Sequence, residues 1–255
     1  INIPLIAVNF ISPKLGWIMA QDATILTTSN GGESWRIQTG APKPMMTVQD
    51  EELNSIKINY ELRHAFFPIS SEGWAVGKYG AILHNPDGGP VWLDQESGSP
   101  AFLNRIQFVN ERMAWVVGSW GTILFTNDAG ATWIPQSSNS GYDLNGLHFI
   151  DIYKGWVVGN YGIVLCTTNS GATWSSRKSK VNENLYSVFF VNEKEGWIVG
   201  EKGLVLYTND GGSTWLHENS GTESDLYCIK RIDNDNLIAI GSDGVIIRLA
   251  IGKTS

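Results

Sequence analysis

Residues 196–215 read GWIVGEKGLVLYTNDGGSTW, and this stretch decides the fold. Two short apolar runs, Trp197–Val199 and Leu204–Tyr207, flank a link with glycine at both ends. A second polar turn, Asn209–Gly212, follows and leads to Trp215. Short apolar runs separated by glycine-containing turns predict successive antiparallel strands joined by hairpins.

The same stretch recurs along the chain. Its first tryptophan has counterparts at Trp17, Trp74, Trp115 and Trp156, and its last at Trp35, Trp92, Trp133 and Trp174. The two tryptophans of each pair are 18 positions apart, and the last four pairs follow one another at a period of 41 residues. A period of about 40–45 residues with several short strands per repeat is typical of β-propellers. We therefore predict an all-β propeller of four-stranded antiparallel blades, with strands A to D running outward.

Each repeat begins with a leucine, and these leucines are Leu5, Leu62, Leu103, Leu144, Leu185 and Leu226. The sequence thus predicts six blades in a single domain over residues 1–255, at about 1–40, 55–99, 100–141, 142–181, 182–222 and 223–255. The sixth blade is incomplete, because it has no closing tryptophan and no strand D. Either this blade is short, or Ile1–Ile3 pairs along it, or the native chain extends further.

An insertion at about residues 40–54 separates the first two blades. Pro42 and Pro44 predict an extended start, and Val48–Leu53 is expected to form one or two helical turns. Two interpretations stay open: a tolerated surface loop, or a lid or docking lobe over the mouth of the ring.

Composition narrows the function classes. The chain has 18 basic and 25 acidic residues and a net charge of −7, which argues against a general nucleic-acid or anionic-membrane binder. No apolar run reaches the length of a membrane helix. Cys166 and Cys228 fall in different repeats and are expected to be free, buried thiols. We expect no metal and no cofactor, since no zinc, EF-hand, P-loop or GxSxG motif occurs.

The turn before each closing tryptophan has its own repeated pattern, as in Thr126–Trp133, TNDAGATW. Its aspartate or asparagine stands at Asn30, Asp87, Asp128, Asn169 and Asp210. Such a side chain accepts backbone N–H bonds within its own turn. The pattern matches the Asp-box, also called the BNR repeat, between strands C and D. These five residues are therefore interpreted as structural and not catalytic.

The longer pattern, GW-x-VG-x-x-G-x-[IV]-L-x-T-x-D-x-G-x-TW, resembles the propeller family of photosystem II assembly and stability factors and its non-photosynthetic bacterial relatives. The resemblance covers nearly the whole chain. It implies a non-catalytic scaffold that holds a partner protein, commonly in an exported compartment: periplasmic, cell-surface or secreted. The photosynthetic members resemble a seven-bladed ring, whereas six repeats are counted here.

Candidate binding residues lie in the turns between strands B and C, which share one face of a propeller with the D–A connections. Three consecutive turns carry an aromatic residue at the same position: Tyr79, Trp120 and Tyr161. Exposed aromatic rings in a row can stack on peptides or sugars. Alternatively, each ring packs over the neighbouring blade.

The start of strand A opens on the same face and carries Arg63, His64 and Arg105 in adjacent blades. We predict that these three basic residues lie near Tyr79 and Trp120 and bind a carboxylate or an acidic peptide. Alternatively, they form salt bridges with Glu61, Asp94 or Glu111. The matching positions in later blades, Asn145, Tyr186 and Tyr227, are polar and extend such a surface.

Asp-boxes also occur in sialidases and other glycosidases, so a glycoside hydrolase and a carbohydrate-binding lectin are the alternatives. A sialidase needs an arginine triad, an acid/base aspartate and a Tyr–Glu nucleophile pair. Of seven arginines, only Arg63 and Arg105 stand at the start of a strand A. The sequence therefore favours a protein-binding module with no catalytic residues, whose partner is a protein or acidic peptide, with a glycan as the alternative.

Overall fold

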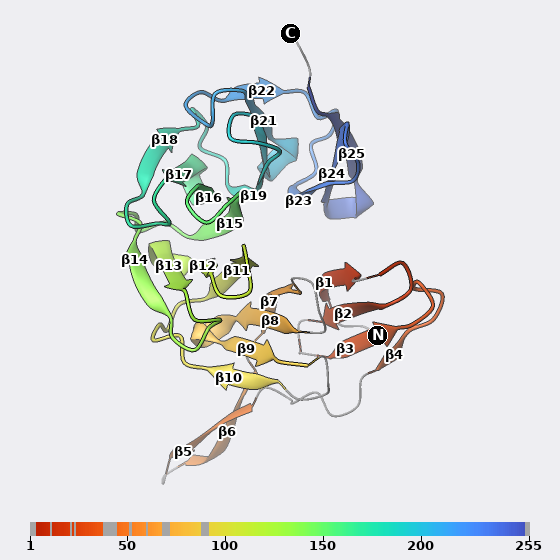
Figure 1. The fold of residues 1–255 in the computed structure, drawn as a ribbon, viewed down its shortest axis with the longest axis vertical. Coiled ribbons are helices and arrows are strands. Elements are labelled where there is room, and N and C mark those ends of the chain that lie inside the picture. The colour runs from red at the N-terminus through yellow and green to blue at the C-terminus, as the bar shows by residue number, and fades with distance from the viewer. Residues whose placement is uncertain are drawn as a thin grey trace. The chain divides into compact units, whose positions relative to one another are not determined.

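The computed structural model describes residues 4–10, 12–20, 22, 24–37, 45–50, 53–59, 61–67, 72–87 and 92–252. In these residues the protein is built from β-strands and five single-turn 3-10 helices. The strands form six antiparallel sheets and a separate two-stranded hairpin (Figure 1). The sheets correspond to the six predicted blades, and the fold class is the all-β, six-bladed propeller that the sequence predicted.

The chain divides into two compact units. The first unit comprises residues Ile1–Trp115 and Thr126–Trp133, and the second comprises Val116–Phe125 and Ile134–Ser255. The division runs through the third sheet, whose strand order is β11-β12-β13-β14. Its strands are β11 (Leu103–Phe108), β12 (Ala114–Gly118), β13 (Thr122–Thr126) and β14 (Ile134–Ser137).

The first unit contains the first two sheets. The first sheet consists of β1 (Leu5–Phe10), β2 (Gly16–Ala20), β3 (Ile25–Thr28) and β4 (Arg36–Ile37). The second consists of β7 (Leu62–Phe66), β8 (Gly73–Gly77), β9 (Ile82–Asn85) and β10 (Leu93–Gln95). The two sheets share an apolar core in which the rings of Trp17 and Phe67 stack at 5.9 Å. Burial of these large aromatic side chains holds neighbouring blades together.

The insertion forms a β-hairpin of β5 (Met45–Asp50) and β6 (Leu53–Asn59). The expectation of helical turns at Val48–Leu53 is wrong. Apolar residues alternate with polar ones along both strands, with Met46 and Val48 on the first and Ile56 and Ile58 on the second. This period of two is typical of strands, and β-branched residues favour it.

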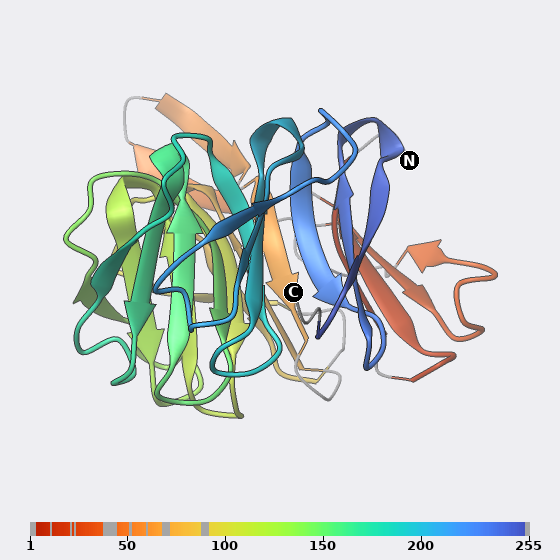
Figure 2. The same cartoon turned by 90° about the horizontal axis from the view of Figure 1, so that it is seen from above.

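The second unit contains three further sheets. The fourth consists of β15 (Leu144–Phe149), β16 (Gly155–Gly159), β17 (Ile163–Thr167) and β18 (Ser175–Lys178). The fifth consists of β19 (Leu185–Phe190), β20 (Gly196–Gly200), β21 (Val205–Thr208) and β22 (Leu216–Glu218). The sixth has three strands only, β23 (Leu226–Arg231), β24 (Asn236–Gly241) and β25 (Ile246–Ala250) (Figure 2).

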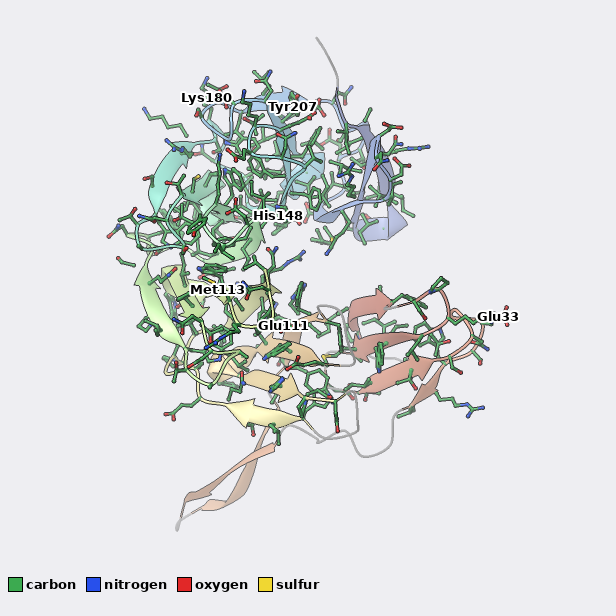
Figure 3. All side chains as sticks on the ribbon, in the orientation of Figure 1. Glu33, Glu111, Met113, His148, Lys180 and Tyr207 are labelled. Carbon is green, nitrogen blue, oxygen red and sulfur yellow. The ribbon has the colours of Figure 1, made fainter. Side chains whose placement is uncertain are left out.

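Aromatic packing joins neighbouring blades of the second unit. The Trp156 indole on β16 stacks on the Phe190 ring of β19 with centroids 3.5 Å apart. His148, labelled in Figure 3, lies on β15 and its Nδ1 accepts a hydrogen bond from the Phe190 N–H (3.2 Å). Gly196 lies beside the same ring, and a Cβ there would come within 2.5 Å of it. Glycine at this position is therefore a packing requirement.

The sixth sheet lacks a fourth strand, as the sequence predicted. Val205 on β21 is fully buried against the sixth sheet, whereas Ile246, at the equivalent position of β25, is 66% exposed. Among the described residues of the second unit, no sheet follows β25 in the chain. Residues Ile1–Ile3, which were expected as one way to complete this blade, lie outside the described residues.

Both cysteines are free thiols. Cys166 on β17 is buried, but Cys228 on β23 is only half-buried. The expectation that both are buried is therefore wrong for Cys228. Ser187, the equivalent residue of the fifth sheet, is buried against the next inner strand, whose Ile229 N–H donates to Ser187 Oγ (3.4 Å), and among the described residues no later sheet follows β23–β25 in the chain.

Candidate functional site

The five B–C turns are the 3-10 helices η1 (Lys78–Gly80), η2 (Ser119–Gly121), η3 (Asn160–Gly162), η4 (Glu201–Gly203) and η5 (Ser242–Gly244). In each turn the middle residue has a positive φ, between 52° and 58°. This left-handed backbone is uncommon for residues other than glycine, asparagine and aspartate. All five middle residues are other than glycine, so the surrounding structure must hold each turn in this conformation.

Three of these middle residues are the aromatic residues singled out in the sequence. Tyr79 is 58% exposed, Trp120 is 64% exposed and Tyr161 is 65% exposed. Neighbouring rings contact two of them, because Tyr79 packs edge-on against Phe102 at 5.9 Å and Tyr161 lies 4.9 Å from Tyr142. Tyr79 and Tyr161 therefore touch neighbouring rings, and all three aromatic side chains are exposed to solvent. Ligand binding by these residues stays a prediction.

The B–C turns and the D–A connections meet at one end of the blades within each unit. In the second unit, the Asn160 N–H donates to the Asp143 carbonyl and the Glu201 N–H to the Asn184 carbonyl, both at 2.9 Å. We call this end the turn face. In the second unit it comprises residues 119–121, 138–143, 160–162, 179–184, 201–203, 219–225 and 242–244.

Side chains from the following blade hold three of the turns. The Trp120 N–H donates to Asp143 Oδ1 (3.0 Å), the Tyr161 N–H to Asn184 Oδ1 (3.1 Å) and the Lys202 N–H to Asp225 Oδ1 (2.9 Å). Sequence reasoning missed this interaction. Its signal is an aspartate or asparagine directly before the first leucine of the fourth, fifth and sixth repeats.

A β-bulge marks the start of strand A. The pairing of strands A and B shifts by one residue, which leaves Arg63, Asn145, Tyr186 and Tyr227 as the extra residues of their strands. Bulges redirect side chains and are frequent beside functional sites. Arg63 is one of the predicted basic residues. Asn145, Tyr186 and Tyr227 are the matching positions that the sequence singled out in the later blades.

In the second unit the bulge side chains reach their neighbours. Asn145 Nδ2 donates to Asn160 Oδ1 (2.8 Å) and to the Leu185 carbonyl of the next inner strand (3.0 Å). The Tyr186 hydroxyl lies 3.4 Å from Glu201 Oε1, and the Tyr186 and Tyr227 rings are 5.4 Å apart. The bulge residues therefore form a continuous polar and aromatic row over three strands.

Glu201 and Tyr186 have opposite shifts in pKa. The backbone N–H of Asn184 donates to Glu201 Oε2 (3.0 Å), and its side-chain amide donates to Oε1 (2.7 Å); the backbone bond is the main cause that lowers the pKa of Glu201. Burial, and then the charges of Glu201 and Asp225, raise the pKa of Tyr186 to about 12. At neutral pH the site thus holds a charged carboxylate beside a neutral phenol.

The predicted basic residues lie in the first unit. Arg63 on β7 is exposed, and His64 on β7 and Arg105 on the neighbouring strand β11 are half-buried. Within the described parts of the chain, neither arginine forms an ion pair, and Glu61 pairs with Lys78 instead. The expected salt bridges of these arginines are thus not formed. Their nearness to Trp120, which belongs to the second unit, stays a prediction.

The tryptophan-terminated turns have the hydrogen bonds of a closed loop. Asp128 Oδ1 accepts bonds from the Thr126 hydroxyl (2.7 Å) and the Thr132 N–H (2.9 Å), and Oδ2 accepts the Thr132 hydroxyl (2.7 Å). These bonds, led by the Thr132 hydroxyl, lower the pKa of Asp128 to about 2. Asp210 makes the same three contacts with Thr208 and Thr214.

Asparagine replaces aspartate in two of these turns and retains the main bond. Asn169 Oδ1 accepts the Thr173 N–H and Asn30 Oδ1 the Ser34 N–H, both at 3.0 Å. The Asp87 N–H donates to Asn85 Oδ1 (3.2 Å), and residues 88–91 of that turn lie outside the described residues. A purely structural role for the five residues stays a prediction.

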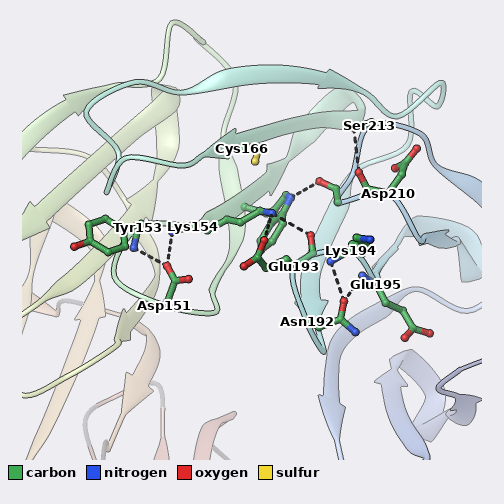
Figure 4. A network of polar contacts seen from close by, with 12 residues as sticks. Asp151, Tyr153, Lys154, Cys166, Asn192, Glu193, Lys194, Glu195, Asp210 and Ser213 are labelled. Atoms are coloured by element: carbon green, nitrogen blue, oxygen red, sulfur yellow. Dashed lines mark hydrogen bonds and ion pairs between the residues drawn. The ribbon is translucent and has the colours of Figure 1, made fainter.

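The opposite end of the blades joins the fourth and fifth sheets (Figure 4). Lys154 Nζ donates to the Glu193 carbonyl (3.1 Å) and lies 3.4 Å from Glu193 Oε2. Asp151 Oδ1 accepts the N–H groups of Tyr153 and Lys154 at 2.7 Å. Polar side chains at this end are thus engaged in turn and inter-blade bonds.

The described residues contain neither a metal-binding cluster nor a membrane-spanning helix. Across the described residues, no cluster of three or more histidine, cysteine or acidic side chains has the arrangement to hold a metal ion. In the same part of the chain, no helix has the length and apolar character needed to cross a membrane.

Comparison with known proteins places the chain in a family. A family model described as "Photosynthesis system II assembly factor YCF48" matches residues 1–100, 91–179, 141–226 and 178–250. The rice (Oryza sativa subsp. japonica) protein "Photosystem II stability/assembly factor HCF136, chloroplastic" is 32% identical over 80 residues, 31% of this chain and 17% of its own length. The Synechococcus sp. (strain CC9902) "Photosystem II assembly lipoprotein Ycf48" is 29% identical over 86 residues, 33% of this chain and 22% of its own. The matching segments thus span about a fifth of the length of these relatives.

Solved structures share the fold. The structure titled "YCF48 bound to D1 peptide" superposes with a TM-score of 0.52 at 20% identity, over 96% of this chain and 91% of that one. An "ancestral GH74 enzyme" gives a TM-score of 0.70 at 12% identity, over 94% of this chain and 35% of that one. At these identities the likeness shows the fold alone, whereas the family model matches along nearly the whole sequence. The chain belongs to the YCF48 family of photosynthesis system II assembly factors.

Proposed function

We propose that this protein is a non-catalytic assembly-factor propeller whose turn face holds a segment of a partner protein. The observation that carries the proposal is the repeated, left-handed turn that exposes Tyr79, Trp120 and Tyr161. A backbone conformation unfavourable for large side chains is kept at each position while the ring faces solvent. Exposed aromatic residues of this kind are enriched at protein interfaces.

Family relatives support a protein as the ligand. One solved YCF48 is described as bound to a D1 peptide, and we infer that the ligand of this chain is likewise a protein segment. One relative is named a lipoprotein, and we infer that this chain also acts in an exported compartment. These inferences concern partner class and compartment, and they are separate from the fold.

The first unit fits an acidic part of such a segment. Arg63 is exposed at a bulge and Arg105 lies on the neighbouring inner strand, and neither is engaged by an acidic side chain within the described residues. Guanidinium groups that are not neutralised internally can form two-pronged bonds with a carboxylate. With His64 and Tyr79 they make the part of the turn face that we assign to carboxylate recognition.

The glycoside hydrolase alternative has only the shared fold in its support, and a lectin would use the same exposed aromatic residues as a protein-binding module. On the turn face of the second unit, Asp143, Glu201 and Asp225 each accept backbone N–H bonds that hold a turn or connection. A general acid and a nucleophile must instead present free oxygens to the substrate. The structure therefore favours protein binding.

Capture of partners from an envelope extract of the source organism tests the proposal. Trp120→Ala and Tyr161→Ala are expected to lose a partner that the unchanged protein retains. Tyr153→Ala is the matched control, because Tyr153 is similarly exposed but precedes β16, whereas Tyr161 follows it. The partner is identified by mass spectrometry and its binding segment by a peptide array. Equal capture by all variants would overturn the proposed site, and no specific partner would overturn the function.

A further inference from the structure

The turn face of the second unit is richer in aromatic residues than the three B–C turns indicate. Among the described residues of this unit, the exposed aromatic residues are Trp120, Tyr142 and Tyr161 on the turn face, Tyr227 next to it at the start of β23, and Tyr153 at the opposite end. Four tyrosines on or next to this face form two tilted pairs. The Tyr142 and Tyr161 rings are 4.9 Å apart at 48°, and the Tyr186 and Tyr227 rings 5.4 Å apart at 52°.

Carboxylates accompany both ring pairs. Asp143 follows Tyr142 directly, and its Oδ1 binds the Trp120 N–H at 3.0 Å. Glu201 lies 3.4 Å from the Tyr186 hydroxyl, and the Glu201 and Asp225 charges both act on that phenol. The face as a whole has six acidic residues, Asp143, Glu183, Glu201, Glu223, Asp225 and Asp243, against two basic ones, Lys180 and Lys202.

The internal lysine does not neutralise this arrangement. Lys202 is the cation nearest to Glu201 in sequence, but among the described residues the two side chains form no ion pair. The backbone of Lys202 is held by Asp225 at 2.9 Å. The carboxylate oxygens of Glu201 are instead bound by neutral donors of Asn184 and Tyr186. Glu201 is thus held by neutral donors without an ion pair. The Asn184 backbone bond is the main cause that lowers the pKa of Glu201, and the Lys202 charge is the last of the causes.

Electron-rich rings beside carboxylates that form no ion pair among the described residues favour cationic ligands. An ammonium or guanidinium group over a tyrosine face gains a cation–π attraction, and a nearby carboxylate adds a charge-assisted bond. A carboxylate ligand would meet like charge, and a neutral sugar could stack on the rings and donate hydroxyls to the carboxylates but would gain no charge attraction. The opposite end of this unit is acidic too, but it has one exposed aromatic residue, Tyr153, next to carboxylates engaged in turns.

We propose that the turn face of the second unit binds a basic protein segment, with lysine or arginine side chains seated at the Tyr142–Tyr161 and Tyr186–Tyr227 pairs. The proposal rests on the protein-binding function and names the chemistry of the ligand in this unit. This basic ligand differs from the ligand proposed for the first unit, where Arg63 and Arg105 fit an acidic segment. The two units are thus assigned ligand segments of opposite charge.

Fluorescence anisotropy with three labelled nine-residue peptides tests this proposal. The peptides alternate serine with lysine, with arginine or with glutamate, and cellohexaose serves as a competing neutral glycan. The basic peptides are expected to bind at least about tenfold more tightly than the acidic one, with an affinity that falls as salt is raised. Cellohexaose is expected not to compete.

Variants locate the site. Tyr227→Ala is expected to weaken the lysine and arginine peptides by about fivefold, and Tyr227→Phe to retain binding, because the ring and not the hydroxyl faces the cation. Asp225→Asn removes a charge but keeps an acceptor for the Lys202 N–H, and is expected to weaken binding similarly. Tyr153→Ala and Asp235→Asn are the matched controls at the opposite end and are expected to leave affinity within about twofold.

Equal binding of acidic and basic peptides, displacement by cellohexaose, or equal losses in the controls would overturn the proposal. Equal losses in the control variants would mean that the basic peptides are attracted by the net negative charge of the protein and not by this face. Circular dichroism of each variant separates a lost site from a lost fold. If partner capture succeeds while the basic peptides fail, this inference falls and the proposed function stands; if capture itself yields no partner, the proposed function falls.

Discussion

The Trp120 backbone N–H donates a hydrogen bond to Asp143 Oδ1, and 3.0 Å separates the two atoms. The bond runs from the turn of one blade to the residue that opens the next. Trp120 has a φ of 57°, a conformation that costs an L-residue on the order of 1 kcal/mol. The Asp143 side chain thus helps to hold a strained turn with its indole toward solvent.

Asp143→Ala is therefore expected to lower the free energy of unfolding by about 1–2 kcal/mol, since it leaves the Trp120 N–H without its acceptor. Urea denaturation followed by circular dichroism measures the change. Asp143→Asn is the matched control, because Asn184 makes the equivalent bond to Tyr161. Equal stability of the alanine variant and the unchanged protein would show that the bond does not hold the turn.

Gly196→Ala is expected to destabilise the fold by about 1–3 kcal/mol, the usual effect of overpacking a core. Its Cβ would come within 2.5 Å of the Phe190 ring, which is already stacked on Trp156 at 3.5 Å. Gly141→Ala is the control, because nothing lies within 4 Å of a Cβ there. Urea midpoints compare the two variants, and similar losses in both would contradict the packing argument.

Stability at low pH tests the turn-closing role of Asp128. Hydrogen bonds from Thr132 and Thr126 lower the pKa of Asp128 to about 2. The folded pKa is below the unfolded one, so the contribution is present above about pH 4 and is lost as the pH falls through about 2.

Asp128→Asn is expected to flatten this dependence while it retains the fold, because Asn169 closes the corresponding turn of the next blade. Asp128→Ala is expected to lower the thermal midpoint at neutral pH. Thermal melts at pH 7, 4 and 2.5 measure both effects. Unchanged stability in Asp128→Ala, together with lost partner binding, would assign this residue to function instead.

The Tyr186 phenol is expected to ionise at a higher pH than an ordinary tyrosine. Burial and the charges of Glu201 and Asp225 raise the pKa of Tyr186 to about 12. The folded pKa is above the unfolded value, so any stability from the neutral phenol is present below about pH 10 and is lost as the pH rises through about 12. Ultraviolet difference titration of tyrosinate measures the shift.

Tyr186→Phe should remove from that titration one tyrosine that ionises near pH 12, which we call the late component. Tyr207, whose pKa is raised first by burial and then by Glu195, remains in the variant. Tyr227→Phe is the control, and it should leave the late component in place. A titration curve of Tyr186→Phe with the same high-pH amplitude as the unchanged protein would contradict the assignment.

Features that repeat within one short segment could be predicted from the sequence. The spacing of Trp197 and Trp215 and the glycines between them specify the strands and turns of one blade, and the other copies repeat them. All of these contacts are local, so the blade could be derived without knowledge of the rest of the chain. The same reasoning located Tyr79, Trp120 and Tyr161 at exposed turn positions.

The insertion could not be derived in this way, because it occurs once. In Val48–Leu53 the polar residues Gln49 to Glu52 obscure the alternation that continues at Ile56 and Ile58. Only the pairing of Met45–Asp50 with Leu53–Asn59 resolves the helix-or-strand ambiguity. Short segments of mixed pattern are decided by their partner strand more than by their own residues.

The polar contacts of the turn face were also missed. The bond between Trp120 and Asp143 joins residues 23 positions apart in different blades. The bonds that Asn184 and Tyr186 make to Glu201 depend on a bulge that moves one residue out of register. The shift breaks the alternation of β19, because Ser187 and Val188 are both buried. This break in the pattern does not reveal which residues Tyr186 contacts.

Strand order has a consequence for biosynthesis. In the fourth sheet, β15, β16, β17 and β18 pair only with their neighbours in the chain. All strand-pairing partners of this sheet are therefore available once Lys178 has left the ribosome, before translation of the next repeat is complete. Such a polypeptide can mature blade by blade on the nascent chain, and its slowest step is expected to be the docking of finished sheets on one another rather than the search for distant strands.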